Sequence, residues 1–154
     1  MRKGHLHICL LQPEIPQNTG NIARLTAATG CRLHLILPLG FNTEEKQLRR
    51  PGLDYWPYLD LEIHDSFEDF CKTVNPQKMA FFSAKATQSY QTISPEVDVL
   101  IFGRETSGLP PELRERYAKQ LYKIPIFHPK VRSLNLANCV ALTVYHQLHM
   151  KGIT

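Results

Sequence analysis

The chain has 154 residues, 43% hydrophobic and 21% charged, which is typical of one compact globular domain over residues 1–154. No run approaches the roughly 20 apolar residues that span a bilayer, which argues against a membrane protein. The basic start lacks the features of a secretory signal, so we expect a cytoplasmic protein. The formal net charge of +4 is a mild bias toward polyanions, and alone it leaves RNA binding and an ordinary solvated surface equally open.

The cysteines are far apart in the sequence, so no CxxC metal or redox motif is present. Buried free thiols suit an intracellular chain better than disulfides do. We therefore expect no metal ion, and free thiols at Cys9, Cys31, Cys71 and Cys139.

Strand-like and helix-like patterns alternate along the first part of the chain. Residues 5–11 predict an apolar strand, residues 19–30 a helix that ends at Gly30, and residues 33–37 a second strand. Residues 40–59 are irregular and contain the aromatic side chains Tyr55, Trp56 and Tyr58 close together. These could cover a substrate or simply pack against the core or a partner, and the pattern favours neither.

The alternation continues to the end of the chain. Residues 60–64 predict an edge strand, and Ser66 is expected to cap a helix that runs to about Val74. Further strands are expected over 79–84, 97–102 and 121–124, and further helices over 110–119 and 134–150. The whole pattern predicts an α/β fold, a parallel sheet flanked by helices on both faces.

The segment PEIPQNTGNIAR, residues 13–24, forms a polar connection between the first strand and the first helix. In open α/β sheets, ligands bind at the carboxyl ends of the strands. Asn18 and Asn21 offer hydrogen bonds there, and Arg24 offers a cation one turn into the helix. The sequence contains no GxxxxGK[ST] and no GxGxxG after the first strand, which argues against a P-loop and an ordinary dinucleotide site.

The segment FGRETSGLP, residues 102–110, follows another buried strand. Gly103 stands where the strand ends, and a residue without a Cβ lets a ligand approach the backbone. Taken alone, the pattern is better explained by a tight turn that needs glycine.

The segment IPIFHPKVRSLNLAN, residues 124–138, leads from a third strand into the last helix. Ser133 is expected to cap that helix, and Asn135 and Asn138 lie in its first turns, where free N–H groups can hold a ligand. Plain capping would also explain this pattern. The three segments all follow strands of one predicted sheet, so we expect them to meet at one edge.

In order and spacing, these segments resemble the three motifs of the SPOUT RNA methyltransferases, and most closely the minimal tRNA wobble-ribose 2′-O-methyltransferases of the TrmL/YibK type. The likeness covers nearly the whole chain. It implies a SPOUT fold in which the C-terminal segment of the α/β chain forms a deep trefoil knot. It also implies S-adenosylmethionine as cofactor, tRNA rather than DNA as partner, and a homodimer with active sites at the subunit interface.

The resemblance also assigns residues. The cofactor would be bound, largely through backbone groups, by Phe82, Gly103, Ile124, Ser133 and Leu134. The catalytic residues would be Arg24, Asn135 and Tyr145, and the substrate would be bound by Asn18, Asn21, Arg24 and Arg132.

Some of these roles have alternatives. Arg24 is expected to face the partner's cofactor, and because arginine stays charged it is expected to stabilise a developing alkoxide rather than act as a base. For Asn18 and Asn135, locking of the loops is as good an explanation as substrate contact, and for Tyr145 the alternative is packing at the dimer interface. His146 departs from the glutamate that the family often has.

The reaction implied is methylation of the ribose 2′-OH of cytidine 34 or uridine 34 of tRNA. The same chemistry on another RNA, such as rRNA, and a non-catalytic RNA-binding module on the same scaffold remain as alternatives. A methyltransferase for small molecules is a weaker third possibility.

Overall fold

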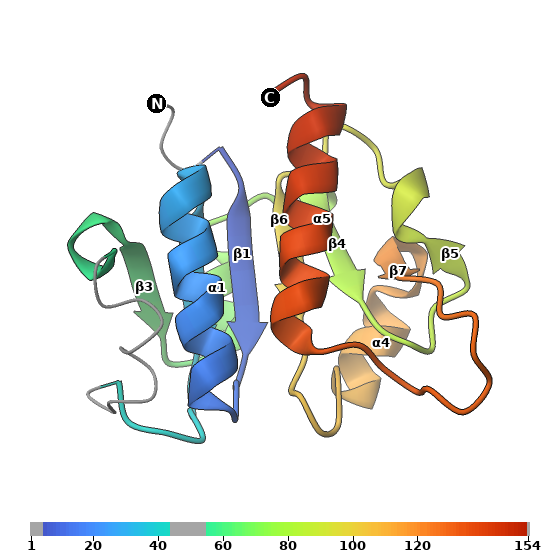
Figure 1. The fold of residues 1–154 in the computed structure, drawn as a ribbon, viewed down its shortest axis with the longest axis horizontal. Coiled ribbons are helices and arrows are strands. Elements are labelled where there is room, and N and C mark those ends of the chain that lie inside the picture. The colour runs from blue at the N-terminus through green and yellow to red at the C-terminus, as the bar shows by residue number, and fades with distance from the viewer. Residues whose placement is uncertain (1–4, 44–54, 154) are drawn as a thin grey trace.

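The computed structural model describes residues 5–43 and 55–153, and within these residues a sheet of seven parallel strands forms the centre of the molecule (Figure 1). Its strand order is β3-β2-β1-β6-β4-β7-β5. The strands are β1 (His7–Leu11), β2 (Arg32–Ile36), β3 (Asp60–His64), β4 (Met79–Phe82), β5 (Gln88–Ser89), β6 (Val99–Phe102) and β7 (Leu121–Lys123). The predicted parallel sheet is confirmed, and β3 lies at an edge as expected.

Helices cover both faces of the sheet, also as predicted. On one face α1 (Pro16–Thr29) and α5 (Leu136–Met150) lie side by side (Figure 1). The opposite face carries the shorter α3 (Phe67–Cys71) and α4 (Pro111–Arg116). Single 3-10 turns are η1 (Trp56–Tyr58), η2 (Pro76–Lys78), η3 (Tyr90–Thr92) and η4 (Ala118–Gln120). None of the described helices is long and apolar enough to cross a membrane.

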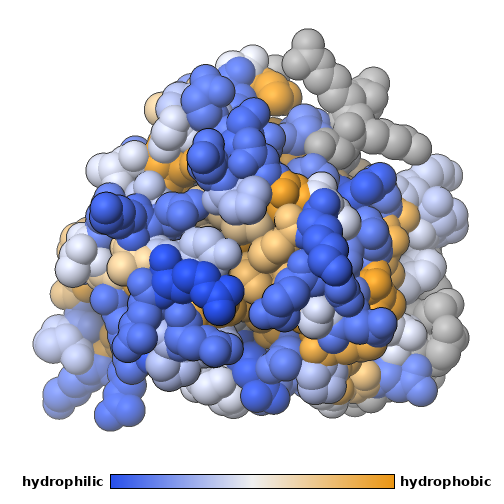
Figure 2. Space-filling view, turned by 180° about the vertical axis from the view of Figure 1, so that it is seen from behind, coloured by the Kyte–Doolittle hydropathy of each residue, from blue (hydrophilic) through white to orange (hydrophobic). Residues whose placement is uncertain are grey.

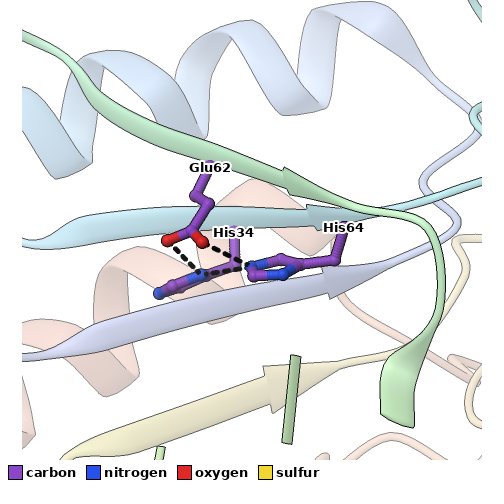
Figure 3. A group of neighbouring side chains, drawn as sticks. All are labelled: His34, Glu62 and His64. Carbon is purple, nitrogen blue, oxygen red and sulfur yellow. Dashed lines mark hydrogen bonds and ion pairs between the residues drawn. The ribbon is translucent and has the colours of Figure 1, made fainter. Parts of the chain in front are cut away.

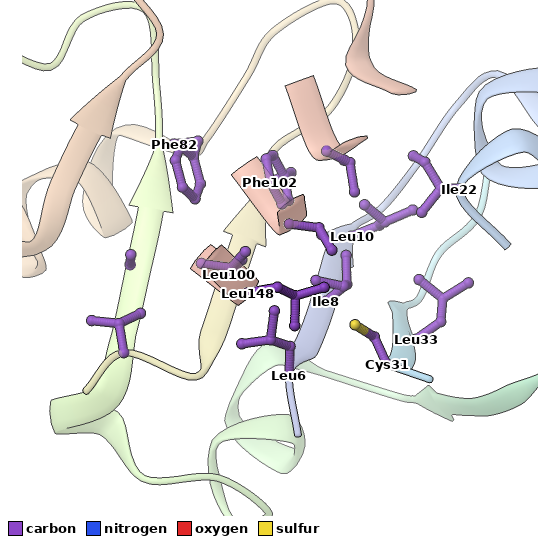
Figure 4. Packing of buried hydrophobic residues seen from close by; sticks show 14 of the residues in the cluster. Leu6, Ile8, Leu10, Ile22, Cys31, Leu33, Phe82, Leu100, Phe102 and Leu148 are labelled. Atoms are coloured by element: carbon purple, nitrogen blue, oxygen red, sulfur yellow. The ribbon is translucent and has the colours of Figure 1, made fainter. Parts of the chain in front are cut away.

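The core is divided by the sheet into two apolar clusters. Side chains alternate between the faces along a strand, so Ile8 packs under α1 and α5, whereas Cys9 packs toward α3 and α4. In the first cluster the Phe82 and Phe102 rings stack with centroids 4.7 Å apart (Figure 4). Because both faces of the central strands are covered, these strands are continuously apolar. Figure 2 shows the reverse side of the molecule, where hydrophilic side chains predominate and apolar residues are visible between them.

The long helices begin at different residues from those predicted. α1 begins at Pro16, because proline fits the first turn of a helix, and it ends as expected at Gly30, whose φ is 70°. The predicted cap at Ser133 is wrong. α5 begins at Leu136, and Asn135 is its N-cap, because the Asn135 side-chain oxygen accepts hydrogen bonds from the backbone N–H groups of residues 137 and 138 at 2.9 and 3.3 Å.

The shorter helices and strands have the predicted type but not always the predicted length. The Ser66 cap is confirmed, since its hydroxyl accepts a 3.1 Å bond from the Asp69 N–H, but α3 ends at Cys71 rather than near Val74. α4 likewise ends at Arg116, before η4. The two-residue strand β5 was not predicted. All the cysteines are free in the structure, as expected.

The irregular segment over residues 40–59 is only partly described, and its basic stretch 46–50 lies outside the described residues. The aromatic side chains of Tyr55, Trp56 and Tyr58 have different surroundings. Trp56 packs against the core, Tyr55 contacts Arg24, and Tyr58 is 76% exposed. Packing against the core, one of the two alternatives, is therefore observed for Trp56, and a role of the segment in covering a substrate stays a prediction.

Gln147 connects α5 to the segment that precedes β6. We expect its replacement to destabilise the fold. Its buried amide donates to the carbonyls of Ser94 and Val97 at 2.9 and 2.8 Å. Gln147→Met keeps the length of the side chain but leaves these carbonyls without their donor, so the free energy of unfolding should fall by about 1–3 kcal/mol. Urea unfolding measures this. The exposed Gln77→Met should stay within about 0.5 kcal/mol of the unaltered protein, and an equal stability of both variants would contradict the assignment.

Candidate active site

A cavity of about 570 Å³ opens at the carboxyl ends of β4, β6 and β7. Its size is typical of a site for a small ligand or cofactor. The three loops singled out in the sequence all contribute to its wall, so the expectation that they meet at one edge is confirmed. The predicted site residues that line the cavity are Asn18, Phe82, Gly103, Ile124, Arg132, Ser133, Leu134 and Asn135.

The carboxylate of Glu105 holds the start of α1 against the loop that follows β6. One oxygen accepts the Glu14 N–H at 2.9 Å, and the other accepts the Ile15 N–H at 2.7 Å and the Asn18 amide at 3.4 Å. The helix has no side-chain cap of its own at Ile15. A negative charge at a helix N-terminus is favourable, so Glu105 supplies from a distant part of the chain what the local sequence lacks.

Asn18 and Asn135 join the first loop to the start of α5. The Asn135 amide donates to the Asn18 side-chain oxygen at 3.1 Å, and Asn18 is 7% exposed. Asn135 uses its own oxygen to cap α5, so both ends of its amide are engaged. The locking of the loops suggested as one alternative is therefore observed, whereas a contact of either residue with substrate stays a prediction.

Glu14 adds a second connection between the same loops. Its carboxylate accepts the Thr106 hydroxyl at 2.7 Å and the Thr106 N–H at 3.1 Å, and Arg104 lies 3.8 Å away. These donors, with a smaller contribution from Arg104, lower the pKa of Glu14 from its usual value. Glu14 therefore stays ionised at neutral pH and holds Thr106 at the rim of the cavity.

The turn after β6 is too tight for any residue but glycine at position 103. A Cβ on Gly103 would lie 2.2 Å from the Gly108 carbonyl carbon and 2.3 Å from the Leu109 nitrogen. Arg104 and Gly108 bond to each other across this turn, and Gly108 itself has φ 70°. Both explanations given for the glycines, a tight turn and a backbone exposed to the cavity, thus hold at Gly103.

Three predicted residues do not line the cavity of their own chain. Asn21 and Arg24 are exposed on α1, and Tyr145 is 57% exposed on α5. The Arg24 guanidinium donates to the Tyr55 hydroxyl at 3.1 Å and lies 4.7 Å from the centre of its ring. Their catalytic and substrate-binding roles stay predictions.

The charges and thiol around the cavity limit its chemistry. Basic side chains line it, at Lys85, Arg104, Arg114, Lys123 and Arg132. Such a set suits an anionic ligand such as an RNA phosphate or a carboxylate. Cys139 also lines the cavity, but burial raises the pKa of its thiol, so this cysteine is a poor nucleophile.

Sequence reasoning missed the roles of Glu14, Glu105 and Tyr55. Both glutamates stand inside the motif segments, and an acidic residue directly after an apolar strand was an available signal. The partners were not predictable, because the Glu14–Glu105 contact joins residues 91 positions apart. The position of Tyr55 under Arg24 likewise depends on the path of the irregular segment.

We expect Glu105→Gln to loosen the first loop. The amide keeps one acceptor oxygen, so one of the N–H groups at Glu14 and Ile15 loses its bond. The free energy of unfolding should fall by about 1–2 kcal/mol, measured by urea unfolding. The exposed Glu115→Gln on α4 is the matched control and should have almost no effect. Equal stability of the two variants would show that the Glu105 bonds do not hold the loop.

Known proteins resemble this chain over nearly its full length. A tRNA (cytidine(34)-2′-O)-methyltransferase of Methylovorus glucosotrophus is 46% identical over 140 residues, 90% of each chain. The enzyme of that name from Escherichia coli K12 is 42% identical over 149 residues, 96% of this chain and 94% of its own. A solved structure described as concerning the 2-OH methylation of C/U34 on tRNA is 47% identical, with a TM-score of 0.85 over 94% of this chain and 95% of that one.

The family model described as the SpoU rRNA Methylase family matches residues 5–145, from the start of the sheet to the middle of the last helix. This range contains all three loops that line the cavity. The resemblance noted in the motifs is thereby confirmed, and the chain belongs to the SpoU methylase family.

Proposed function

We propose that the protein is a tRNA 2′-O-methyltransferase that uses S-adenosylmethionine to methylate the ribose of nucleotide 34, the wobble position. The single observation that carries the proposal is the cavity built by all three motif loops, in a chain between 42% and 47% identical to proteins described by that reaction. The relatives from Methylovorus glucosotrophus and Escherichia coli are bacterial enzymes named for tRNA, which supports a place in the cytoplasm.

The residues at the cavity fit the proposed cofactor. Phe82, Ile124 and Leu134 give apolar surface for an adenine ring, and the main chain at Gly103 and Ser133 lies at the wall, where it offers polar groups. The volume of about 570 Å³ is sufficient for a nucleoside joined to an amino acid. When bound, S-adenosylmethionine supplies a methyl group that its sulfonium centre already activates, so the protein has only to position the acceptor and assist loss of its proton.

Arg24 is the residue that we propose acts on the acceptor. A ribose 2′-OH gains negative charge on oxygen as its proton leaves, and this charge is lost again when the oxygen bonds to the methyl group and a neutral thioether departs. A guanidinium stays protonated and can stabilise that charge, and a neighbouring RNA phosphate could help to remove the proton. Tyr55 limits the movement of Arg24 through its hydroxyl and its ring, and so would keep the guanidinium oriented.

The location of Arg24 supports a homodimer. Arg24 does not line the cavity of its own chain, which fits an arrangement in which it completes the partner's cavity. The exposed side chains of α5 include the apolar Leu142, Tyr145 and Met150, at 41%, 57% and 39% exposure. We propose that α5 contributes this surface to the interface, with Tyr145 packing there or contacting substrate.

The proposal also includes the trefoil knot of the SPOUT fold. Residues 102–109 and 132–136 line one cavity although α4 and β7 separate them in the chain. A knot would hold these two loops together by threading, which would suit a cofactor bound mostly by backbone. Limited proteolysis of the C-terminal segment with and without S-adenosylmethionine would test this arrangement.

The target RNA can be tested in cells. If the proposal is right, tRNA from a deletion strain should lack one 2′-O-methylated nucleoside at position 34, detected by nucleoside mass spectrometry, and the intact gene should restore it. The description of the family model names rRNA, so rRNA from the same strain is the comparison. Unchanged tRNA together with a methyl group lost from rRNA would overturn the tRNA assignment.

We expect Arg24→Ala to retain its fold and its affinity for S-adenosylmethionine but to lose methyl transfer by at least about 100-fold. Tyr55→Phe, which keeps the ring and removes one hydrogen bond, should have a smaller effect. Arg116→Ala, on the opposite face of the sheet, is the control and should remain active. The assay is methyl incorporation into tRNA, and turnover of Arg24→Ala close to the control would contradict the role of Arg24.

An RNA with a 2′-deoxy nucleotide at position 34 should not be methylated.

A further inference from the structure

A second group of reactive side chains lies on the sheet face that α3 covers, away from the cavity. His34 is on β2, and Glu62 and His64 are on β3, the neighbouring edge strand. Cα partners in the parallel register share a face, which places His34 beside Glu62, and His64 follows two residues later on the same face. Figure 3 shows the two imidazoles facing each other and the carboxylate reaching toward both.

The distances within this group are short. His34 Nδ1 lies 2.9 Å from His64 Nε2, and the two carboxylate oxygens of Glu62 are each 4.0 Å from a different one of these nitrogens. At 4.0 Å the carboxylate makes no hydrogen bond to either ring. It lies beside both nitrogens, close enough for a small shift to bring all three groups to a shared ion.

We propose that His34, Glu62 and His64 form a binding site for a divalent transition-metal ion of the Zn²⁺ class. Imidazole nitrogens and a carboxylate oxygen are donors that zinc uses in proteins, and three of them leave a fourth position for water. Donors about 2.1 Å from a tetrahedral ion are roughly 3.4 Å apart. The two histidine nitrogens would therefore separate by about 0.5 Å, and one Glu62 oxygen, which lies within 4.8 Å of both, would move closer by up to about 1.4 Å. The proposal departs from the expectation of no metal ion, which had considered only the cysteines.

A third histidine, His7, contacts the second ring nitrogen of His34 and so affects which nitrogen carries the proton. His34 Nε2 lies 2.9 Å from His7 Nδ1 on β1. If His34 donates its Nε2 proton to His7, its Nδ1 lone pair is directed at the site and accepts the Nε2 proton of His64. Binding of an ion would break this last hydrogen bond, and the His64 proton would move to Nδ1 of the same ring. Burial, helped by the neighbouring histidines, lowers the pKa of His34 to about 3, so no proton has to leave this ring at neutral pH.

The surroundings give the site both a closed and an open side. The edge of the Phe70 ring contacts His34 and His64, with centroids 4.8 and 5.3 Å away, and forms an apolar wall. Glu62 is 42% exposed on the edge strand, so an ion can enter from solvent on that side. The nearby cation, Arg32, is paired with Asp60 at 3.1 Å and lies 3.7 Å from Glu62, so two carboxylates offset its charge.

The test uses the full chain without a histidine tag, after treatment with a chelator. Titration calorimetry with Zn²⁺ should show one ion bound per chain, and the ion should raise the midpoint of thermal unfolding, since it binds the folded state. Glu62→Gln should weaken binding by at least about tenfold. Glu68→Gln, an exposed glutamate on α3, is the matched control and should bind as the unaltered protein does.

His64→Gln should remove saturable binding, with circular dichroism to check that this buried substitution still folds. Should that variant unfold, the half-exposed Glu62→Gln decides the matter alone. All variants keep the same cysteines, so the differences report on this site. Absence of saturable binding to the unaltered protein, or equal binding by Glu62→Gln and Glu68→Gln, would overturn the proposal and leave the histidines as a structural hydrogen-bonded row. Neither result bears on methyl transfer.

Discussion

The carboxylate of Glu105 is the contact on which the candidate active site depends. It accepts the backbone N–H groups of Glu14 and Ile15 at the start of α1, where no local side chain caps the helix. It also bonds Asn18, which in turn accepts from Asn135 at the start of α5. One acidic side chain therefore fixes the relative positions of three loops that are distant in sequence and adjacent at the cavity.

This arrangement explains why the asparagines were ambiguous in the sequence. Asn18 and Asn135 are polar residues at helix starts beside a ligand cavity, and both capping and binding favour such residues. In the structure their side chains bond to each other, and Asn135 also caps α5. The amides are thus engaged within the protein, which makes the shape of the cavity wall their first role, whatever else they contact.

The sequence predicted those features that depend on local pattern. Apolar runs and turn residues located the central strands and both long helices, and the motif order located the loops that meet at the cavity. The start of α5 was misplaced because Ser133 and Asn135 are both good N-caps, and only the geometry distinguishes them. The Glu105 contacts, the Arg24–Tyr55 pair and the row of histidines join separate segments, so no local pattern contains them.

The separation of these partners has a consequence for how the protein is made. Asn18 and Asn135 are 117 positions apart, so synthesis must reach the last helix before their bond can close the site. Contacts this distant have a larger loop-closure cost than local ones. A partly synthesised chain can already pair β1 with β2 but does not yet have a complete cavity. The wall of the cavity is therefore complete only when the final segment is in place.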